Sequence, residues 1–199
     1  MTARESLTDR LPQRTPNERV DLIFEFLERR GSSHYDEEVT QLEHALQCAQ
    51  LATKSQSGAS AIAAALLHDI GHLLLDEHSD SEGSSETDRN HEEYGAEFLA
   101  PYFPPEVTEP VRLHVPAKRY LCTTEVTYYE TLSEASKHSF QLQGGALSDE
   151  ERAEFEEHPQ LKPALQLRRW DDLAKVIDHV APEIETYREQ MLAAMREED

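Results

Sequence analysis

Apolar and polar residues recur with a helical period along most of the chain. Residues 15–18, Thr-Pro-Asn-Glu, combine a capping Thr, a Pro in the first turn and a Glu at the third helical position, which is typical of a helix start. Apolar residues then recur at i, i+3, i+4 and i+7 from Val20 to Leu27, and Gly31 ends the pattern. Similar signals predict helices over residues 40–54, 106–113, 133–143 and 183–195, with others starting at His91 and Ser148.

No segment of the sequence alternates with the two-residue period of a strand. The pattern therefore predicts an all-α fold, a helical bundle of eight or so helices in a single domain over residues 15–199. Residues 1–14 mix charge, Pro and Thr, and we expect them to form a loose N-terminal arm. We also expect the helix over 106–113 to close on His114, because Pro116 follows it.

The most apolar stretch of the chain, residues 61–72, reads Ala-Ile-Ala-Ala-Ala-Leu-Leu-His-Asp-Ile-Gly-His. Ala and Leu favour helix, so the stretch predicts a buried helix that ends in three ionisable side chains. Because an uncompensated buried polar group costs about 2–7 kcal/mol, His68, Asp69 and His72 need partners. Either neighbouring side chains supply them, as in a core pair with a helix cap, or a metal does. An adjacent His-Asp pair with a second His one turn later favours metal or acid–base chemistry.

Composition narrows the class of protein. A formal net charge of −21 argues against binding DNA or RNA, although a small anion can still find a locally basic pocket. No segment reaches the roughly 20 apolar residues of a membrane helix, and the N-terminus lacks the apolar core of a signal peptide. Two distant cysteines, Cys48 and Cys122, fit a reducing compartment. We expect a cytoplasmic protein without nucleic-acid or membrane partners. The oligomeric state stays open, and a monomer is compatible with the sequence.

Several His and Asp residues border apolar helical faces, and together they outnumber the ligands of one tetrahedral ion. They are His44, His68, Asp69, His72, His91, His114 and one acidic residue after Trp170. Imidazole and carboxylate form the ligand set of iron, manganese or zinc. A dinuclear site with one bridging carboxylate would use the whole set, and Asp69 is the natural bridge. Taken singly, His44, His91 and His114 are more typical of surface or packed histidines. Their occurrence together with the His-Asp pair is what favours a metal site.

The motifs around these residues resemble a known family. His44, the pair His68-Asp69 and a late Asp resemble the HD-domain metalloproteins, an all-helical superfamily named for the His-Asp pair. The resemblance becomes more specific with the segments Gln41–Gln47, Ala64–His72, His91-Glu92, His114–Leu121, Tyr128-Tyr129, Leu132–Ser136, Gln143–Gly145 and Arg168–Asp171. Together they are similar to the mixed-valent diiron oxygenases that cleave organophosphonates, such as 2-amino-1-hydroxyethylphosphonate. These enzymes are relatives of myo-inositol oxygenase. The similarity spans roughly residues 34–195.

The resemblance implies a role for each matching residue. One iron would be held by His44, His68, Asp69 and Asp171. Asp69 would bridge to a second iron, which His91 and His114 would also hold. The phosphonate would be contacted by His72, Lys118, Ser136 and Arg168. These cations and this hydroxyl also suit a dianion on chemical grounds alone. Taken without the resemblance, Lys118 and Arg119 are more typical of a solvated helix end.

Two further roles lie upstream of His44. Family members carry a Tyr that occupies an iron when substrate is absent and a Glu that meets the substrate amine. Tyr35 and Glu37 are the matching residues in this chain. The spacing from the Tyr to the following motif is one residue shorter than in the family, which makes Glu38 a rival of Glu37.

The activity that the resemblance implies is oxygenative C–P bond cleavage by an Fe(II)/Fe(III) pair with O2 as co-substrate. The substrate would be (1R)-2-amino-1-hydroxyethylphosphonate, cleaved to glycine and phosphate. One alternative is its trimethylammonium analogue, which would need an aromatic or acidic cage. A second is an HD-type phosphohydrolase that activates water with a metal. A third is a helical binding module without metal.

Overall fold

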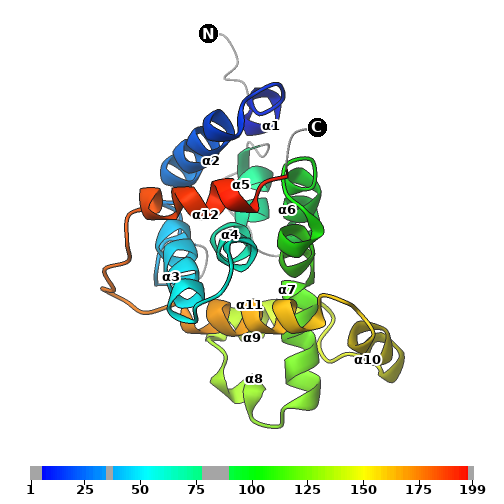
Figure 1. Cartoon of the computed structure of the whole chain (residues 1–199). Helices are drawn as coiled ribbons and strands as arrows, with labels where there is room; N and C mark the ends of the chain where they lie inside the picture. The colour runs from blue at the N-terminus through cyan, green and yellow to red at the C-terminus, as the bar shows by residue number, and fades with distance from the viewer. Residues whose placement is uncertain (1–5, 35–37, 78–89, 197–199) are drawn as a thin grey trace.

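A computed structural model describes residues 6–34, 38–77 and 90–196, and within these ranges the regular structure is entirely helical (Figure 1). The prediction of an all-α fold is confirmed. The elements are α1 (Leu7–Arg10), α2 (Pro16–Arg30), α3 (Gln41–Lys54), α4 (Ala59–Leu67), α5 (Ile70–Glu77), α6 (His91–Leu99), α7 (Pro105–Thr124), α8 (Tyr128–Thr131), α9 (Glu134–Leu142), α10 (Asp149–Glu156), α11 (Leu161–Leu173), the 3₁₀ helix η1 (Ile184–Tyr187) and α12 (Arg188–Ala194).

Capping residues fix where several helices begin. Thr15, Thr40 and Ser148 each accept a hydrogen bond from the backbone N–H three residues on, and the Glu side chain at that position accepts one from the backbone N–H of the cap residue. These reciprocal bonds satisfy backbone N–H groups that would otherwise lack partners at the first turn. Ser133 caps α9 in the same way from its side chain alone. The starts predicted at these four positions are confirmed.

Helix α4 forms the centre of the molecule and packs against α3, α7, α11 and α12 (Figure 1). Its residues 62–67 are all buried. The stretch Ala59–Asp76 is long and apolar enough to cross a membrane by length and composition, but 61% of it is buried within the fold. Its apolar character is therefore explained by its place in the core.

The chain bends between α4 and α5 instead of continuing as one helix. Helix α4 ends at Leu67 and α5 begins at Ile70, so His68 and Asp69 occupy the turn between them. Gly71 then brings α5 close to α6, because a Cβ at this position would lie 1.9 Å from the carbonyl oxygen of His91. Gly95 of α6 faces the same contact. The close approach of these two helices places His91 beside the His-Asp pair.

Helix α7 runs from Pro105 to Thr124, so the prediction that it closes near His114 is wrong. Pro110 and Pro116 both lie inside it. A proline in a helix interior removes one backbone hydrogen bond, but packing against α4, α6 and α11 keeps α7 continuous. The consequence is functional, because His114 and Lys118 are four residues apart on one face of an unbroken helix.

Part of the N-terminal segment expected to be loose is folded onto the core. Within residues 6–14, Ser6 caps α1 through a reciprocal bond with Asp9. Leu7 and Leu11 are fully buried and belong to the main hydrophobic cluster. Two apolar anchors therefore dock this arm onto the helices that follow.

Helices α8, α9 and α10 lie outside the main hydrophobic cluster and cover one end of α7 and α11 (Figure 1). One small cluster joins Leu121 to Tyr128 and Leu132, and another joins Ala117 and Ala164 to Phe155. Arg119 also ties the loop after α9 by donating to the carbonyl oxygen of Gly145 at 2.8 Å. This outer layer is attached by a few side chains, not by a shared core.

Candidate functional site

Four buried imidazoles face one another in two pairs. His44 of α3 and His68, after α4, approach to 3.1 Å between their Nε2 atoms. His91 of α6 and His114 of α7 do the same, also at 3.1 Å. Each ring comes from a different element, and none is more than 5% exposed. Residues up to 70 positions apart in the sequence, from His44 to His114, thus meet in one place.

The carboxylate of Asp69 lies between the two pairs. Its Oδ2 is 3.6 Å from His44 Nε2 and 3.4 Å from His68 Nε2. Its Oδ1 is 3.5 Å from His91 Nε2 and 3.6 Å from His114 Nε2. One oxygen therefore faces each pair of imidazoles, which is the arrangement of a carboxylate that bridges two ions.

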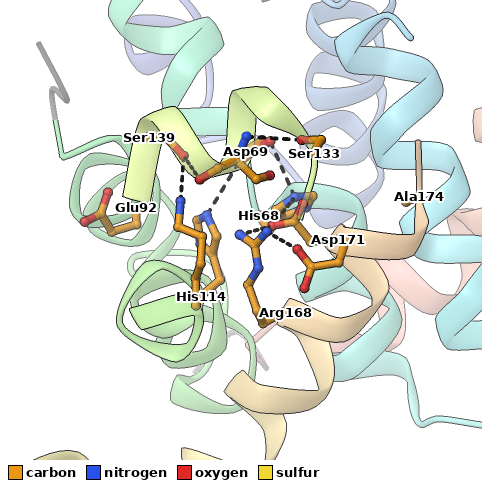
Figure 2. A network of polar contacts seen from close by, with 12 residues as sticks. His68, Asp69, Glu92, His114, Ser133, Ser139, Arg168, Asp171 and Ala174 are labelled. Atoms are coloured by element: carbon orange, nitrogen blue, oxygen red, sulfur yellow. Dashed lines mark hydrogen bonds and ion pairs between the residues drawn. The ribbon is translucent and has the colours of Figure 1, made fainter. Parts of the chain in front are cut away.

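Asp171 of α11 completes the first group. Its Oδ1 lies 3.3 Å from His44 Nε2 and its Oδ2 lies 4.0 Å from His68 Nε2. Arg168, one turn earlier on α11, donates to Asp171 Oδ2 at 2.7 Å (Figure 2). It also pairs with Asp172. The guanidinium thus holds the Asp171 carboxylate toward the imidazoles.

Backbone carbonyls fix the tautomer of three rings. His44 Nδ1 donates to Ala174 O at 2.9 Å, His68 Nδ1 to Ala65 O at 2.9 Å, and His114 Nδ1 to Val111 O at 2.7 Å. A carbonyl oxygen only accepts, so Nδ1 carries the proton and a neutral ring presents a lone pair at Nε2. Burial lowers the pKa of His68 and His114, which keeps both rings neutral.

Opposing influences set the pKa of the remaining groups. Burial alone would raise the pKa of Asp69, but the imidazoles of His68, His72, His91 and His44 outweigh it and lower the pKa. Burial would likewise raise the pKa of Asp171, yet Arg168 holds it well below its usual range. For His44, burial lowers the pKa and Asp171 raises it, with a net rise. Both carboxylates are therefore ionised at neutral pH.

The donor set fits a pair of metal ions. Two neutral Nε2 lone pairs and two ionised carboxylates converge in a buried space, and acceptors cannot satisfy one another without a cation. Ligands about 2.1 Å from one ion lie about 3.0–3.4 Å apart when adjacent, for octahedral or tetrahedral angles. Apart from the 4.0 Å between His68 Nε2 and Asp171 Oδ2, the separations given above for each group are 3.1–3.6 Å, close to this range.

The chain's overall sequence identifies its family. A model of the HD domain matches residues 42–176, which is more than half of the chain. The chain belongs to the HD-domain family. His68 and Asp69 occupy the turn between α4 and α5 at the centre of this HD domain.

Three relatives each align over more than four fifths of the chain. The chain is 51% identical to hydroxymethylphosphonate dioxygenase of Gimesia maris over 178 residues, 89% of each chain. It is 46% identical over 165 residues to [1-hydroxy-2-(trimethylamino)ethyl]phosphonate dioxygenase (glycine-betaine-forming) of Leisingera caerulea, covering 82% of this chain and 84% of that one. It is 35% identical over 180 residues to the uncharacterized protein L432 of Acanthamoeba polyphaga mimivirus, covering 89% and 82%. The resemblance to HD-domain phosphonate oxygenases, inferred from the sequence motifs, is confirmed.

Cationic and hydroxyl groups line the HD-domain site on the side of α9. Lys118 Nζ donates to Ser139 Oγ at 2.7 Å (Figure 2). Burial, followed by the charge of Arg168, lowers the pKa of Lys118 to about 7. Lys175 Nζ donates to Ser136 Oγ at 2.9 Å. Lys118, Ser136 and Arg168, all named from the sequence, are therefore brought together at one side of the imidazoles.

Of the remaining predicted site residues, the structure describes His72 and Glu38 but not Tyr35 and Glu37. The ring of His72 stacks on His91, with centroids 3.7 Å apart and planes 16° apart, so His72 lies beside the site. Tyr35 and Glu37 lie outside the described residues. Glu38 is exposed in the segment before α3.

Sequence reasoning missed three neighbours of the HD-domain site: Ser139, Lys175 and Glu92. Ser139 follows Ser136 by three residues and so shares its helix face, a signal that the sequence contained. Glu92 is buried beside His91, with Oε2 at 3.5 Å from Nδ1. Lys175 follows the end of α11 at Leu173, where no periodic pattern predicts the direction of a side chain.

Proposed function

We propose that the protein is a mixed-valent diiron oxygenase that cleaves the C–P bond of a small 1-hydroxyphosphonate with O2 and releases phosphate. The observation that carries the proposal is the Asp69 carboxylate, which offers one oxygen to each of two imidazole pairs. The names of the two dioxygenase relatives support oxygenation and a phosphonate substrate.

We assign the ligands by group. The first iron would be held by His44, His68, Asp69 and Asp171, and the second by Asp69, His91 and His114. Bound iron would supply the one-electron redox chemistry and O2 activation that no side chain offers. Backbone carbonyls orient the rings of His44, His68 and His114 through their Nδ1 groups, as is usual for metal-binding histidines.

The residues on the α9 side orient the substrate. Lys118, Ser136 and Arg168 would bind the phosphonate oxygens, because ammonium, hydroxyl and guanidinium groups are the natural donors to a dianion. His72, stacked on His91, lies at the edge of the same space and would add a further contact. The low exposure of Lys118 and Arg168, 3% each, excludes water and strengthens these charged contacts.

The group on the substrate carbon is the least constrained part of the proposal. The 51% identity makes hydroxymethylphosphonate the first substrate to test. The acidic Glu37 in the sequence favours (1R)-2-amino-1-hydroxyethylphosphonate, with glycine and phosphate as products. The trimethylammonium analogue, named for the Leisingera caerulea relative, is the third.

One set of measurements tests the proposal. Anaerobically purified protein should contain two irons per chain and give an electron paramagnetic resonance signal of a coupled Fe(II)/Fe(III) pair after one-electron oxidation. The signal should shift on adding hydroxymethylphosphonate, and phosphate release should match oxygen uptake one to one for at least one of the three phosphonates. Manganese or zinc with phosphate-ester hydrolysis and no oxygen uptake would instead identify a phosphohydrolase. Protein without bound metal would contradict both.

A further inference from the structure

We infer that Lys175 is a second phosphonate-binding cation, which forms with Lys118 an ammonium clamp beneath the serines of α9, and that Gln47 positions it. The inference rests on the proposed function, since it extends the anion side of the same site. It adds Lys175 as a residue that binds the substrate, and Gln47 as a residue that acts only by positioning Lys175.

The two lysines reach α9 from different elements and meet adjacent turns of it. Lys118 of α7 donates to Ser139 at 2.7 Å, and Lys175 donates to Ser136 at 2.9 Å. Ser136 and Ser139 are three residues apart, and Ser139 Oγ also donates to the Ser136 carbonyl at 3.1 Å. The two ammonium groups therefore lie side by side below one face of α9.

This gathering of positive charge is unusual for this chain. The sequence contains 19 Lys and Arg against 40 Asp and Glu, yet Arg168, Lys118 and Lys175 meet in one region. Arg168 is paired with Asp171 and Asp172, whereas Lys118 donates to a neutral hydroxyl. Burial lowers the pKa of Lys118 most, and the charges of Arg168 and Lys175 lower it further. A dianion between the two ammonium groups would relieve this repulsion.

Lys175 also stands close to the proposed first iron. Its Nζ is 4.0 Å from Asp171 Oδ1, while the side chain remains 17% exposed. The ammonium group thus lies between a metal-facing carboxylate and the hydroxyl of Ser136. A phosphonate that reached the iron from the α9 side would pass within hydrogen-bond distance of it.

Gln47 fixes the backbone that carries Lys175. Its side-chain amide donates to the Val176 carbonyl and accepts from the Val176 N–H, both at 3.0 Å. On the preceding side, His44 donates to the carbonyl of Ala174 at 2.9 Å. The residue between these two anchors is Lys175, so its backbone has little freedom and its side chain is aimed before substrate arrives. Gln47 is 4% exposed, as a positioning residue in the core would be.

The test is binding of methylphosphonate, a dianion without the 1-hydroxyl, to the iron-loaded protein by isothermal titration calorimetry. Lys175→Met should raise the Kd at least about ten-fold, which corresponds to about 1.4 kcal/mol. Iron content and the resting paramagnetic signal should stay unchanged. Lys162→Met, which removes an exposed lysine of α11, is the matched control and should leave the Kd unchanged. Lys175→Arg, which keeps the charge, should recover most of the affinity.

The other outcomes either overturn the inference or separate it from the proposed function. An unchanged Kd in Lys175→Met removes the residue from the clamp, and loss of iron would show that its role is to hold Asp171. If Lys175→Met fails to fold, the charge-conserving variant Lys175→Arg provides the test. Its Kd should stay close to the wild-type value, and a Kd as high as that of Lys118→Met would contradict the clamp. Wild-type protein that binds methylphosphonate but consumes no oxygen with any hydroxyphosphonate would refute the proposed function and leave the clamp standing. Wild-type protein that does not bind it would refute the clamp.

The positioning role has its own readout. Gln47→Leu should weaken methylphosphonate binding in the wild-type background and add nothing to Lys175→Met, because residues that act through one another are not additive. Additive losses would mean that Gln47 acts elsewhere.

Discussion

The two sides of the site lie on different parts of the fold: the imidazole side on helices of the main core, and the serine side on α9. The imidazoles and Asp69 stand on α3, α6, α7 and the turn between α4 and α5, elements that share the main hydrophobic cluster. The serines stand on α9, which lies outside that cluster. Lys118 and Lys175 connect the two sides, because each reaches from the core side to a hydroxyl of α9.

This difference separates two requirements of the proposed chemistry. Ligands of two ions must keep their geometry within tenths of an ångström, and a packed core with rings held by backbone carbonyls provides this. A substrate must enter and leave, and hydrogen bonds between an ammonium group and a hydroxyl can be exchanged for bonds to an anion at little cost. Changes on the metal side should therefore affect metal content, and changes on the α9 side should affect substrate affinity.

The largest expected effect is that of Asp69→Ala. Since this carboxylate faces both imidazole pairs, its loss should remove iron from both positions and reduce oxygen uptake to background. Iron measured by mass spectrometry should fall below one per chain. Asp76→Ala, in the helix α5 that follows the turn containing Asp69, should keep two irons. An Asp69→Ala protein with two irons would mean that the carboxylate is no bridge.

Gly71→Ala tests the close contact between α5 and α6 that positions His91. A Cβ here would meet the carbonyl oxygen of His91 at 1.9 Å, and two packed helices cannot separate without losing core contacts. We expect a loss of about 3 kcal/mol in the free energy of unfolding, at the upper end for overpacking. Gly58→Ala meets nothing within 4 Å and should change it by about 1 kcal/mol or less. Urea unfolding of the two variants checks this, and equal midpoints would contradict the close helix contact.

The sequence predicted local features such as helix starts better than it predicted the packing of distant segments. Thr15, Thr40 and Ser148 allowed three helix starts to be predicted, because capping is a local interaction. The extent of α7 was missed, since Pro116 weakens the helix locally while packing against three other helices restores it. The close pairing of α5 and α6 through Gly71 and Gly95 could not be predicted either, because it depends on two segments that are distant in sequence.

The same distinction explains which functional residues were found. His68, Asp69 and His72 stand out because ionisable residues interrupt an apolar stretch. Lys175 does not stand out, because its direction depends on Gln47, more than a hundred residues earlier. A contact of this kind is a tertiary property.

Lys118→Met should sharpen the contrast between the two sides. Removing a buried ammonium group that binds a dianion should raise KM for hydroxymethylphosphonate about ten-fold to a hundred-fold, since hydrogen bonds to charged groups contribute about 1.5–3 kcal/mol. Iron content should stay at two per chain, because Lys118 donates to Ser139 and not to a ligand. Steady-state oxygen uptake and metal analysis check both expectations. A loss of iron with unchanged KM would reverse the assignment.

The smallest expected effect is a pH dependence carried by Lys118. Its pKa in the folded protein is lowered from 10.5 to about 7, chiefly by burial and then by Arg168, so the free enzyme loses this positive charge as pH rises through about 7. In the proposed function the charged form binds the dianion, and kcat/KM should therefore fall several-fold between about pH 6.5 and 8.5. Phosphonate oxygens also titrate near neutral pH, so the profile of Lys118→Met supplies the baseline. A wild-type profile that runs parallel to this baseline would show that Lys118 keeps its proton, and that its charge is stabilised by groups on the α9 side more strongly than its burial indicates.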